Sequence, residues 1–526
     1  MVHSVIVIAA ATVTVVFGLL VVRRDVKIGG VMLGHDEGMS TPLFADDEDL
    51  FAVMMDGVQT LSTPTETLLE ESAGYADYAH RVPMLVDAHI PIGSNSKLFT
   101  TVAIYQLHER GLLDVDADIA TMLDRGDFAA MGLPISYRSF CPRLAPYGLK
   151  CQTITLRQIL SMSSGIYPTL NCDTDLSPSS CNDVSWLFSH GSLAAMVGTF
   201  LRNPLLFVPG TQYHYSNPNF VLAAYFVEKF SGMTFRKYLE KRIFDPIGLQ
   251  NTYYDYFSGT LEMDPKLPRP YFKYYVPQHH PSDKNKSIST LLSVGMLNVH
   301  TDMGMASGSG GIVSTAKDIR QFWYSLLLNT NNKSAVLLKD PASLTSILTP
   351  YSLVSKSQAH WNNSTFDVWT YYSQGLVLAC LTEDCMDFEE EEEEYGNAAA
   401  RRHRPRWIWY SGLINNFGTA NVLDYQYHAM SQLWTSTRIA SVPSEEDFNK
   451  VVKSQTGRSN PHAQNWTDSR FENPAGNCFH KLLQRYPPPP KTTNHNIDDT
   501  GTKSSLLRLR GLSYEEEDGV HLLPSL

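Results

Sequence analysis

The sequence lacks the short motifs that mark several large functional classes. The glycine-rich residues 307–318 do not end in the Gly-Lys-Ser/Thr of a phosphate-binding loop, and no dinucleotide-binding fingerprint surrounds them. None of the seven cysteines has the Cys-x-x-Cys spacing of a zinc site or a redox motif. The sequence suggests no third metal ligand for the adjacent His279 and His280. We therefore expect neither a metal nor a cofactor, and we interpret residues 307–318 as a tight turn into a helix that Ser314 or Thr315 caps.

Positive charge is also in short supply. The chain has 42 Lys and Arg against 54 Asp and Glu, which gives a formal net charge of −12. A protein that binds nucleic acid usually has a concentrated basic face, so we do not expect nucleic acid as a partner. Part of the acidity is local, in residues 389–394 and 515–518. With 43% hydrophobic residues, the 526 residues are enough for one large two-lobed domain with tails.

The N-terminus contains a separate apolar element. Residues 5–22 are almost wholly apolar and are followed by Arg23 and Arg24. Their length lies between that of a signal-peptide core and that of a membrane span, and no small-x-small cleavage site follows closely. We expect a signal peptide or signal anchor in residues 1–30, which could tether the chain to a membrane, and an acidic stalk in residues 31–60. The basic residues after the segment, taken alone, favour a cytoplasmic body.

The cysteines and the glycosylation sequons favour the other side of the membrane. Six cysteines form close pairs in loop-like sequence, which is typical of disulfides in an oxidising compartment: Cys141 with Cys151, Cys172 with Cys181, and Cys380 with Cys385. Cys478 is left over. Asn-x-Ser/Thr sequons begin at Asn285, Asn332, Asn362, Asn363 and Asn465. We expect a secreted or membrane-anchored protein with a lumenal or extracellular body.

The residues Ser94-Asn95-Ser96-Lys97 open a segment with helical periodicity. Apolar residues recur three and four positions apart after Gly93, and the pattern ends near Gly111. Positions three apart lie on one helix face, so the Ser94 hydroxyl and the Lys97 amine can meet. A buried, uncharged lysine can take a proton from serine, which is a weak nucleophile at neutral pH. The pair is a candidate nucleophile and base, although Ser-x-x-Lys alone also arises by chance in a chain this long.

Two later segments offer polar groups that suit the same chemistry. Tyr215-Ser216-Asn217 precedes an apolar helix expected at residues 220–230, and it provides a phenol and an amide. Tyr410-Ser411-Gly412 lies in an expected strand over residues 407–412, beside a second strand over residues 419–423. After Tyr425 we find no clear strand that would close a sheet. Residues 479–486 are only a weak candidate for a C-terminal helix.

With these three motifs, the chain resembles the serine β-lactamase and penicillin-binding-protein superfamily, specifically its class C-like branch, which includes esterases and D-amino-acid peptidases. The resemblance covers roughly residues 74–425. It includes further blocks in the same order: residues 74–77, 154–165, 209–211, 247–252, 310–318, 348–350 and 372–375. It implies an α+β fold of the β-lactamase/transpeptidase type, with an antiparallel sheet flanked by helices and a mostly helical lobe.

The same resemblance sets the expected domain boundaries. The β-lactamase-related domain would span residues 61–440, with an acidic insertion at about residues 384–406. The remaining residues 441–526 are polar and include a run of prolines at 487–490, so we expect part of this region to be disordered.

The resemblance also implies roles for individual residues. Ser94 Oγ would attack a carbonyl and form an acyl-enzyme, while Lys97 and Tyr215 would carry protons between the serine and the leaving group. Which of these two groups is the base stays open. Asn217 would hydrogen-bond the lysine or a substrate amide. The substrate would lie beside Tyr410 and Gly412, with the backbone N–H groups of Ser94 and Leu413 as the oxyanion hole.

Two departures from the family's pattern bear on the substrate. The third motif usually begins with Lys or His but begins here with Tyr410, which removes a positive partner for a substrate carboxylate. Met162 stands where many relatives have His. We expect a serine hydrolase that acts on a small-molecule ester, amide or peptide, with esters favoured over β-lactams and D-peptides. The alternative is a catalytically inactive scaffold or binding protein with the same fold.

Overall fold

The computed structural model describes most of the chain between residues 56 and 441, together with residues 471–472. The gaps within this range are residues 78–79, 134–140, 142–149, 169–191, 202, 255–263, 281–282, 297–306, 329–333, 362–363, 386–404, 415–416 and 426–427. The predicted N-terminal segment, the acidic run 389–394 and the prolines 487–490 lie outside the described residues. Within the described ranges, no helix has the length and apolar character needed to cross a membrane.

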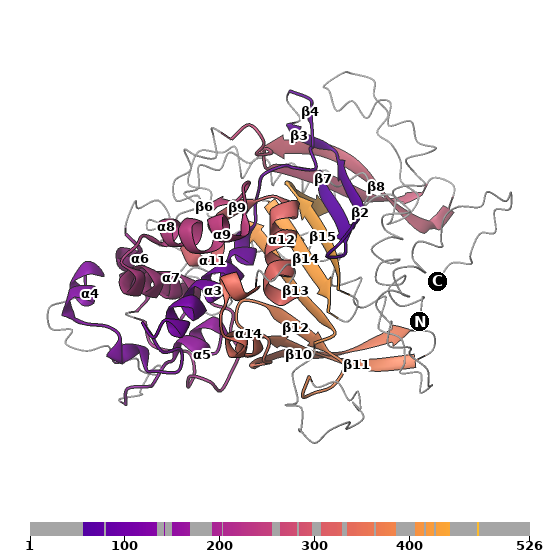
Figure 1. Ribbon diagram of the computed structural model, residues 1–526. Helices are drawn as coiled ribbons and strands as arrows, with labels where there is room; N and C mark the ends of the chain where they lie inside the picture. Colours follow the sequence, from indigo (N-terminus) through magenta and orange to yellow (C-terminus); the bar gives the residue numbers. More distant parts are fainter. Residues whose placement is uncertain are drawn as a thin grey trace.

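An eight-stranded antiparallel sheet forms the centre of the molecule (Figure 1), in the order β10-β11-β12-β13-β14-β15-β1-β2. Strand β1, the first of these strands in the sequence, pairs with β15, the last, and also with β2. The two ends of the domain are therefore joined in one sheet. The strands are β1 (Gly57–Ser62), β2 (Thr67–Ala73), β10 (Ser352–Trp361), β11 (Ser364–Tyr372), β12 (Val377–Cys380), β13 (Trp407–Ile414), β14 (Phe417–Asp424) and β15 (Ala429–Thr435).

Smaller sheets surround the central one. One is a three-stranded sheet of β5 (Ile90–Pro91), β9 (Ile312–Ser314) and β6 (Tyr253–Tyr254). Its strand β5 leads directly into the Ser94 segment. Strands β3 (Tyr75–Asp77) and β4 (Val82–Pro83) form a short pair, and Gly74 takes a φ of 78° at the turn that leads into it. A fourth sheet has the order β17-β16-β7-β8 and consists of β7 (Tyr271–His280), β8 (Asp283–Met296), β16 (Thr437–Ser441) and β17 (Phe471–Glu472).

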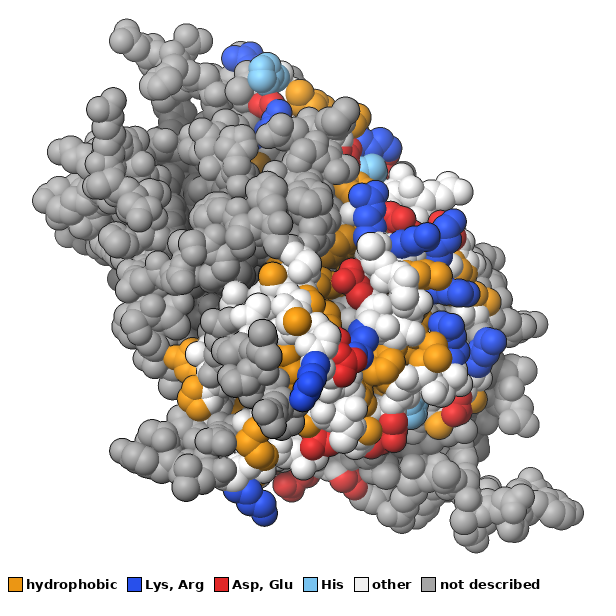
Figure 2. Space-filling model, turned by 90° about the vertical axis from the view of Figure 1, so that its left-hand side faces the viewer, with side chains coloured by type: hydrophobic (Ala, Val, Ile, Leu, Met, Phe, Trp, Pro, Cys, Tyr) orange, Lys and Arg blue, Asp and Glu red, His pale blue; other side chains and the backbone are white. Residues whose placement is uncertain are grey.

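Helices gather beside the central sheet and form the helical lobe (Figure 1). The longer ones are α3 (Ser96–Glu109), α4 (Arg125–Ala130), α6 (Leu193–Phe200), α7 (Asn217–Ser231), α12 (Ala316–Leu327) and α14 (Pro341–Ile347). The shorter ones are η1 (Gly93–Asn95), η2 (Ile119–Thr121), α5 (Leu156–Leu160), α8 (Phe235–Leu239), η4 (Glu240–Phe244), α9 (Asp245–Ile247), α11 (Ser307–Gly310) and α13 (Ser334–Leu337). On the face that carries much of this lobe, acidic and basic side chains are interspersed with hydrophobic ones (Figure 2).

Helix α3 lies at the centre of the hydrophobic core. Its apolar side chains are buried around the whole circumference of its first three turns, which is typical of a helix enclosed by other elements. The ring of Phe99 stacks on that of Phe322 of α12, with 3.8 Å between the ring centroids, and meets the ring of Phe244 edge-on, with 5.6 Å between the centroids. The helix that follows Ser94 is therefore held from several sides before any polar contact is considered.

The predicted α+β arrangement is confirmed, with helices grouped beside an antiparallel sheet. Residues 307–318, expected to be a tight turn into a helix, form the short helix α11, strand β9 and the start of α12. Thr315, one of the two predicted caps, caps α12 by accepting a hydrogen bond from the Asp318 amide. Two predicted disulfides, Cys141–Cys151 and Cys380–Cys385, are formed. The third pair, Cys172 with Cys181, lies outside the described residues, as does Cys478.

Two strands differ from the expectations. Strand β15 follows Tyr425 and closes the sheet against β1, although no closing strand was identified there from sequence. Strand β1 begins at Gly57, so the sheet includes the last residues of the segment expected to be a stalk. Residues 479–486, the weak helix candidate, are outside the described part of the chain.

Candidate active site

Ser94 lies in η1, one turn of 3-10 helix that leads into α3, and its side chain is half-buried. Strand β13 packs closely against this turn. A Cβ atom on Gly412 would stand 1.9 Å from the carbonyl oxygen of Ile92, so only glycine permits this approach. The sequence-predicted pair Gly412 and Leu413 therefore sits next to the serine, with Gly412 opposite Thr419 and Leu413 opposite Gly418 in the ladder with β14.

Lys97 is fully buried one helical turn after Ser94. Its amine donates hydrogen bonds to Ser94 Oγ at 2.9 Å and to the carbonyl oxygen of Ser309 at 2.8 Å. The amine also lies over the rings of Tyr215 and Phe220, 5.0 and 5.6 Å from their centroids. Burial holds the pKa of Lys97 well below its ordinary value. The predicted contact between the serine and the lysine is present, and burial favours the uncharged form of the amine.

Tyr215 completes a three-residue cluster, because its hydroxyl lies 2.7 Å from Ser94 Oγ. It precedes α7 in a segment that Met162 holds in place. The Met162 sulfur accepts hydrogen bonds from the Ser216 backbone amide at 3.3 Å and from the Asn219 side chain at 3.4 Å. Met162 itself has a φ of 58°, an uncommon conformation for a residue other than glycine. The methionine that stands in the place of a histidine thus has a positioning contact in this chain.

Asn217 is the first residue of α7 and is half-buried. Two partners were expected for it, the lysine or a substrate amide. The Lys97 amine donates to Ser94 and to the Ser309 carbonyl, and the role of Asn217 stays a prediction.

Tyr410 extends the cluster on the side of the sheet. Its hydroxyl lies 3.5 Å from that of Tyr215 and 2.7 Å from that of Tyr372, the last residue of β11. Both Tyr372 and Tyr410 are buried, and burial raises the pKa of each phenol well above its ordinary value. This side of the site therefore has two neutral hydroxyls, those of Tyr372 and Tyr410.

The turn that carries Ser94 is fixed to the central sheet by buried polar side chains. The Asn95 amide donates to Thr419 Oγ1 at 2.8 Å, and the Asn421 amide donates to Asn95 Oδ1 at 2.9 Å. Asn421 Oδ1 in turn accepts hydrogen bonds from Gln432 and Trp434 of β15, each at 3.0 Å. Because each link is buried and partnered, this network fixes the turn relative to β14 and β15.

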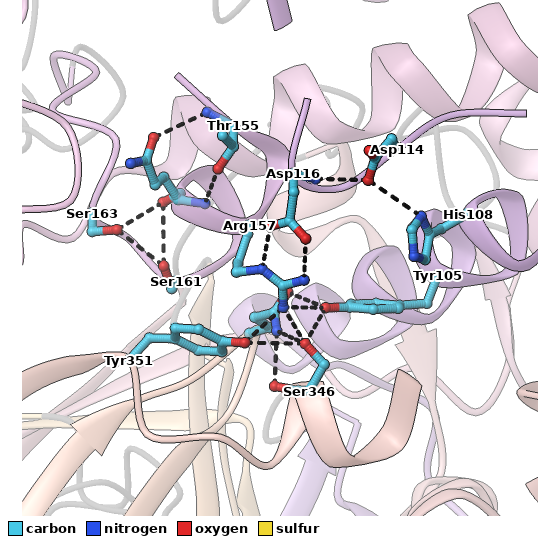
Figure 3. Close-up of polar contacts among 12 residues, drawn as sticks. Tyr105, His108, Asp114, Asp116, Thr155, Arg157, Ser161, Ser163, Ser346 and Tyr351 are labelled. Atoms are coloured by element: carbon cyan, nitrogen blue, oxygen red, sulfur yellow. Dashed lines mark hydrogen bonds and ion pairs between the residues drawn. The ribbon is translucent and has the colours of Figure 1, made fainter. Parts of the chain in front are cut away.

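A second polar cluster holds the turn that follows Tyr372 (Figure 3). Arg157 of α5 pairs with both carboxylate oxygens of Asp116 at 2.5 and 2.7 Å, and it also donates to the hydroxyls of Tyr105, Ser346 and Tyr351. Gln374 joins this cluster by accepting a hydrogen bond from Tyr105 and donating one to the Ser346 carbonyl, both at 2.9 Å. The cluster thereby connects α3, α5 and α14 to the end of β11.

Gly375 brings the same turn against helix α3. It has a φ of 80°, and a Cβ atom there would lie 2.8 Å from the Thr101 hydroxyl and 3.1 Å from the Lys97 carbonyl oxygen. Glycine is therefore required on both conformational and steric grounds. The backbone around Tyr372 is fixed to α3 without help from the tyrosine hydroxyl.

Sequence reasoning missed several groups that the structure brings to the site. The Ser309 carbonyl, the Tyr372 hydroxyl and the amides of Asn95 and Asn421 were not predicted to act there. Tyr372 lies in one of the motifs that carry the resemblance, and this was the only available signal. Among the described residues, no group of three or more His, Cys, Asp and Glu side chains could hold a metal ion.

Comparisons with known proteins found similar chains. The family model described as Beta-lactamase matches residues 49–441. Penicillin-binding protein 4* of Bacillus subtilis is 26% identical over 192 residues, which cover 36% of this chain and 35% of that protein. Lovastatin esterase of Penicillium rubens is 29% identical over 174 residues, which cover 32% of this chain and 40% of the esterase. The matched regions thus span well under half the length of these relatives.

A solved structure is similar in fold. The penicillin binding protein from Bacillus halodurans has a TM-score of 0.50 and 19% identity, and the match covers 76% of this chain and 96% of that one. The long family match, which contains the Ser94–Lys97 helix, the Tyr215 segment and strand β13, decides the assignment. The chain belongs to the beta-lactamase family.

Proposed function

We propose that this chain is a serine hydrolase that forms an acyl-enzyme on Ser94 and acts on uncharged carboxylic esters. The observation that carries the proposal is the hydrogen-bonded cluster in which Ser94 Oγ lies 2.9 Å from the Lys97 amine and 2.7 Å from the Tyr215 hydroxyl. A nucleophile within hydrogen-bond distance of a base is the arrangement that nucleophilic catalysis needs. Among the described residues, the buried Lys97 amine contacts the Ser94 hydroxyl and the Ser309 carbonyl and no carboxylate, which suits a base better than a structural ion pair.

The first half-reaction forms the bond between Ser94 Oγ and the substrate carbonyl carbon. The serine proton passes to the neutral Lys97 amine or through Tyr215, which form one coupled pair. The backbone N–H groups of Ser94 and Leu413 receive the oxyanion. When the bond to the leaving oxygen breaks, the same proton passes to that oxygen and an alcohol departs.

The second half-reaction uses water in place of the alcohol. Water attacks the acyl carbon, gives its proton to the Lys97–Tyr215 pair and displaces Ser94 Oγ, which takes the proton back. The carboxylic acid product leaves and the site returns to its starting state. No other co-reactant is required.

The preference for uncharged esters rests on Tyr410. Its buried phenol stands where relatives have a cation, and a neutral hydroxyl compensates a substrate carboxylate far less well than an ammonium group does. The partial similarity to a lovastatin esterase supports an ester substrate.

We also propose that the catalytic domain lies in a lumenal or extracellular compartment. The disulfides Cys141–Cys151 and Cys380–Cys385 support this placement, because disulfides persist in oxidising surroundings. Peptide mapping of the protein from its native source without reduction tests it: both disulfides should be recovered, whereas free thiols at all four cysteines would contradict it.

Labelling of the full chain with a fluorophosphonate probe tests the proposed activity. Mass spectrometry should find the adduct on Ser94, and Ser94→Ala should abolish it. The same preparation should hydrolyse a neutral p-nitrophenyl ester faster than a matched ester with a carboxylate on its acyl group. Folded protein that is neither labelled nor active would favour the scaffold alternative.

A further inference from the structure

Tyr372 is the first of three phenols whose hydroxyls lead, one after another, to Ser94. The Tyr372 hydroxyl lies 2.7 Å from that of Tyr410, which lies 3.5 Å from that of Tyr215, which lies 2.7 Å from Ser94 Oγ. The rings are also packed together, with the centroid of Tyr372 5.9 Å from that of Tyr410 and 6.2 Å from that of Tyr215. These residues come from β11, β13 and the segment before α7, which are far apart in the sequence.

Proton counting links the directions of the two hydrogen bonds. A phenol has one proton to donate, and in the contact between Tyr372 and Tyr410 either oxygen could be the donor. When the Tyr410 hydroxyl donates to Tyr215, the proton in its contact with Tyr372 comes from Tyr372. Among the described residues, Tyr410 is the hydrogen-bond partner of the Tyr372 hydroxyl.

We propose that Tyr372 is a positioning residue that directs the Tyr410 proton toward Tyr215 and so supports acyl transfer at Ser94. By donating to the Tyr410 oxygen, Tyr372 turns the remaining proton of Tyr410 toward the oxygen of Tyr215. That oxygen gains negative charge whenever Tyr215 passes its proton on, and a hydrogen bond to a charged oxygen is stronger than one to a neutral oxygen. The contact of 3.5 Å should shorten at that moment.

The hydrogen-bonded phenols stabilise the negative charge on Tyr215 in place of a cation. Tyr372 and Tyr410 stay protonated at neutral pH, because burial raises the pKa of each phenol. Each phenol therefore remains a donor throughout the reaction, and neither transfers its own proton. The inference rests on the proposed function, and it adds Tyr372 to the residues on which that function depends.

The surroundings of Tyr372 allow its hydroxyl to be tested separately from its ring. The Ser373 hydroxyl lies within hydrogen-bond distance of the carbonyls of Ile347 and Thr349, and Gln374 donates to the Ser346 carbonyl. With the backbone anchored in this way, Tyr372→Phe should keep the ring in place and remove only the hydroxyl.

A double-mutant cycle with Tyr372→Phe, Tyr410→Phe and the double variant provides the test. We expect kcat for a neutral ester to fall about tenfold in Tyr372→Phe, the usual scale for losing support of a hydrogen bond to a charged group, with KM changed by less than about twofold. Because Tyr372 acts through Tyr410, its substitution should have little further effect in the Tyr410→Phe background.

Tyr324→Phe is the matched control. Tyr324 is also a buried phenol whose oxygen contacts a serine hydroxyl, that of Ser62 at 2.9 Å, but it lies on α12 and makes no contact with the Ser94 cluster. This variant should lose thermal stability to a similar extent and keep its kcat. An equal loss of kcat in both variants would assign Tyr372 a purely structural role.

The outcomes separate this inference from the proposed function. If wild-type protein is labelled at Ser94 and Tyr372→Phe is labelled and turned over at the same rates, the inference is wrong and the proposed function stands. Equal effects of Tyr372→Phe with and without Tyr410 would also overturn it. Absence of labelling in the folded wild-type protein would instead overturn the proposed function. If Tyr372→Phe does not fold, Tyr410→Phe should lose about tenfold or more in kcat, and an unchanged kcat in Tyr410→Phe would overturn the inference, because Tyr372 acts through Tyr410.

Discussion

The amine of Lys97 donates a hydrogen bond to the backbone carbonyl of Ser309, 2.8 Å away and 212 residues later in the sequence. The short helix α11 presents this carbonyl, and Ser307 adopts a φ of 38° at its start. An uncharged carbonyl stabilises an ammonium ion less than a carboxylate does, so it leaves the effect of burial on the lysine largely uncompensated. The contact holds the amine beside Ser94 while burial keeps its pKa low.

Lys97→Met should stabilise the fold at neutral pH while abolishing activity. The pKa of Lys97 is lowered in the folded protein, so between that pKa and about 10.5 the unfolded chain binds a proton that the folded chain does not. The wild-type protein therefore gains stability as pH rises through this window, by up to about 1.4 kcal/mol per pH unit. Urea denaturation between pH 7 and 9.5 should show the advantage of Lys97→Met shrinking.

Lys229→Met is the matched control for this experiment. The Lys229 amine pairs with Asp124 and Asp127, which helps to raise its pKa, so its loss should destabilise the protein over the whole pH range. A difference between wild type and Lys97→Met that does not change with pH would show that Lys97 is charged in the folded state.

Gly412→Ala should destabilise the domain and displace the nucleophile. Its Cβ atom would meet the Ile92 carbonyl at 1.9 Å, and backbone cannot yield as a side chain can. We expect a loss of roughly 3 kcal/mol in the free energy of unfolding, together with a large fall in the rate of Ser94 labelling. Gly126→Ala, on the exposed helix α4, should change neither by much, because its nearest neighbour is a side-chain oxygen of Asp124 at 3.0 Å. Equal stability of the two variants would contradict the close packing of β13 against the turn.

Asn421→Ala should uncouple the Ser94 turn from the sheet. It leaves Asn95 Oδ1, the Gln432 amide and the Trp434 indole without their buried partner. Such a loss costs about 2–4 kcal/mol, and kcat should fall because the serine is less well positioned. Gln106→Ala is a useful comparison, because it removes two hydrogen bonds from helix α3, which follows the turn, at a site away from Ser94. Unfolding by urea and turnover of a neutral ester measure both effects, and a kcat loss no larger than that of Gln106→Ala would argue against a positioning role.

Tyr410→Lys should shift the substrate preference toward carboxylates. The new amine would stand where relatives have a cation and could pair with a substrate carboxylate. We expect the ratio of kcat/KM for a carboxylate-bearing ester to that for its uncharged analogue to rise at least about tenfold. Tyr410→Phe should lower both values by similar factors. An unchanged ratio in Tyr410→Lys would show that position 410 does not select the substrate.

The local part of the site could be predicted from the sequence because its geometry is local. Ser94 and Lys97 are three residues apart on a helix, and helical spacing alone predicts their contact, which the structure has at 2.9 Å. Tyr215 and Tyr410 could be proposed only through the family resemblance, since nothing in their own segments indicates that they meet. The Ser309 carbonyl is a backbone atom in a turn, which no residue type identifies.

Strands β1 and β15 escaped prediction for a common reason. The inward positions of β15 are Met430, Gln432 and Trp434, and a buried glutamine interrupts the apolar alternation by which a strand is recognised. Strand β1 is buried along its whole length, yet half of its residues are polar, Gln59, Thr60 and Ser62. These polar groups find partners only across the finished sheet, as in the hydrogen bond from Thr60 to Gln432 at 2.8 Å. Local sequence contains no sign of such partners.

Rapid quenching of the full chain with a slowly hydrolysed neutral ester tests the central claim most directly. If Ser94 is the nucleophile, intact mass spectrometry should show one acyl group added to the protein within the first turnover, and peptide mapping should place it on Ser94. The acyl group should be absent in Ser94→Ala and should form far more slowly in Lys97→Met. An acyl group on another residue would contradict the account. Turnover of the ester by wild-type protein without any acylated protein would also contradict it.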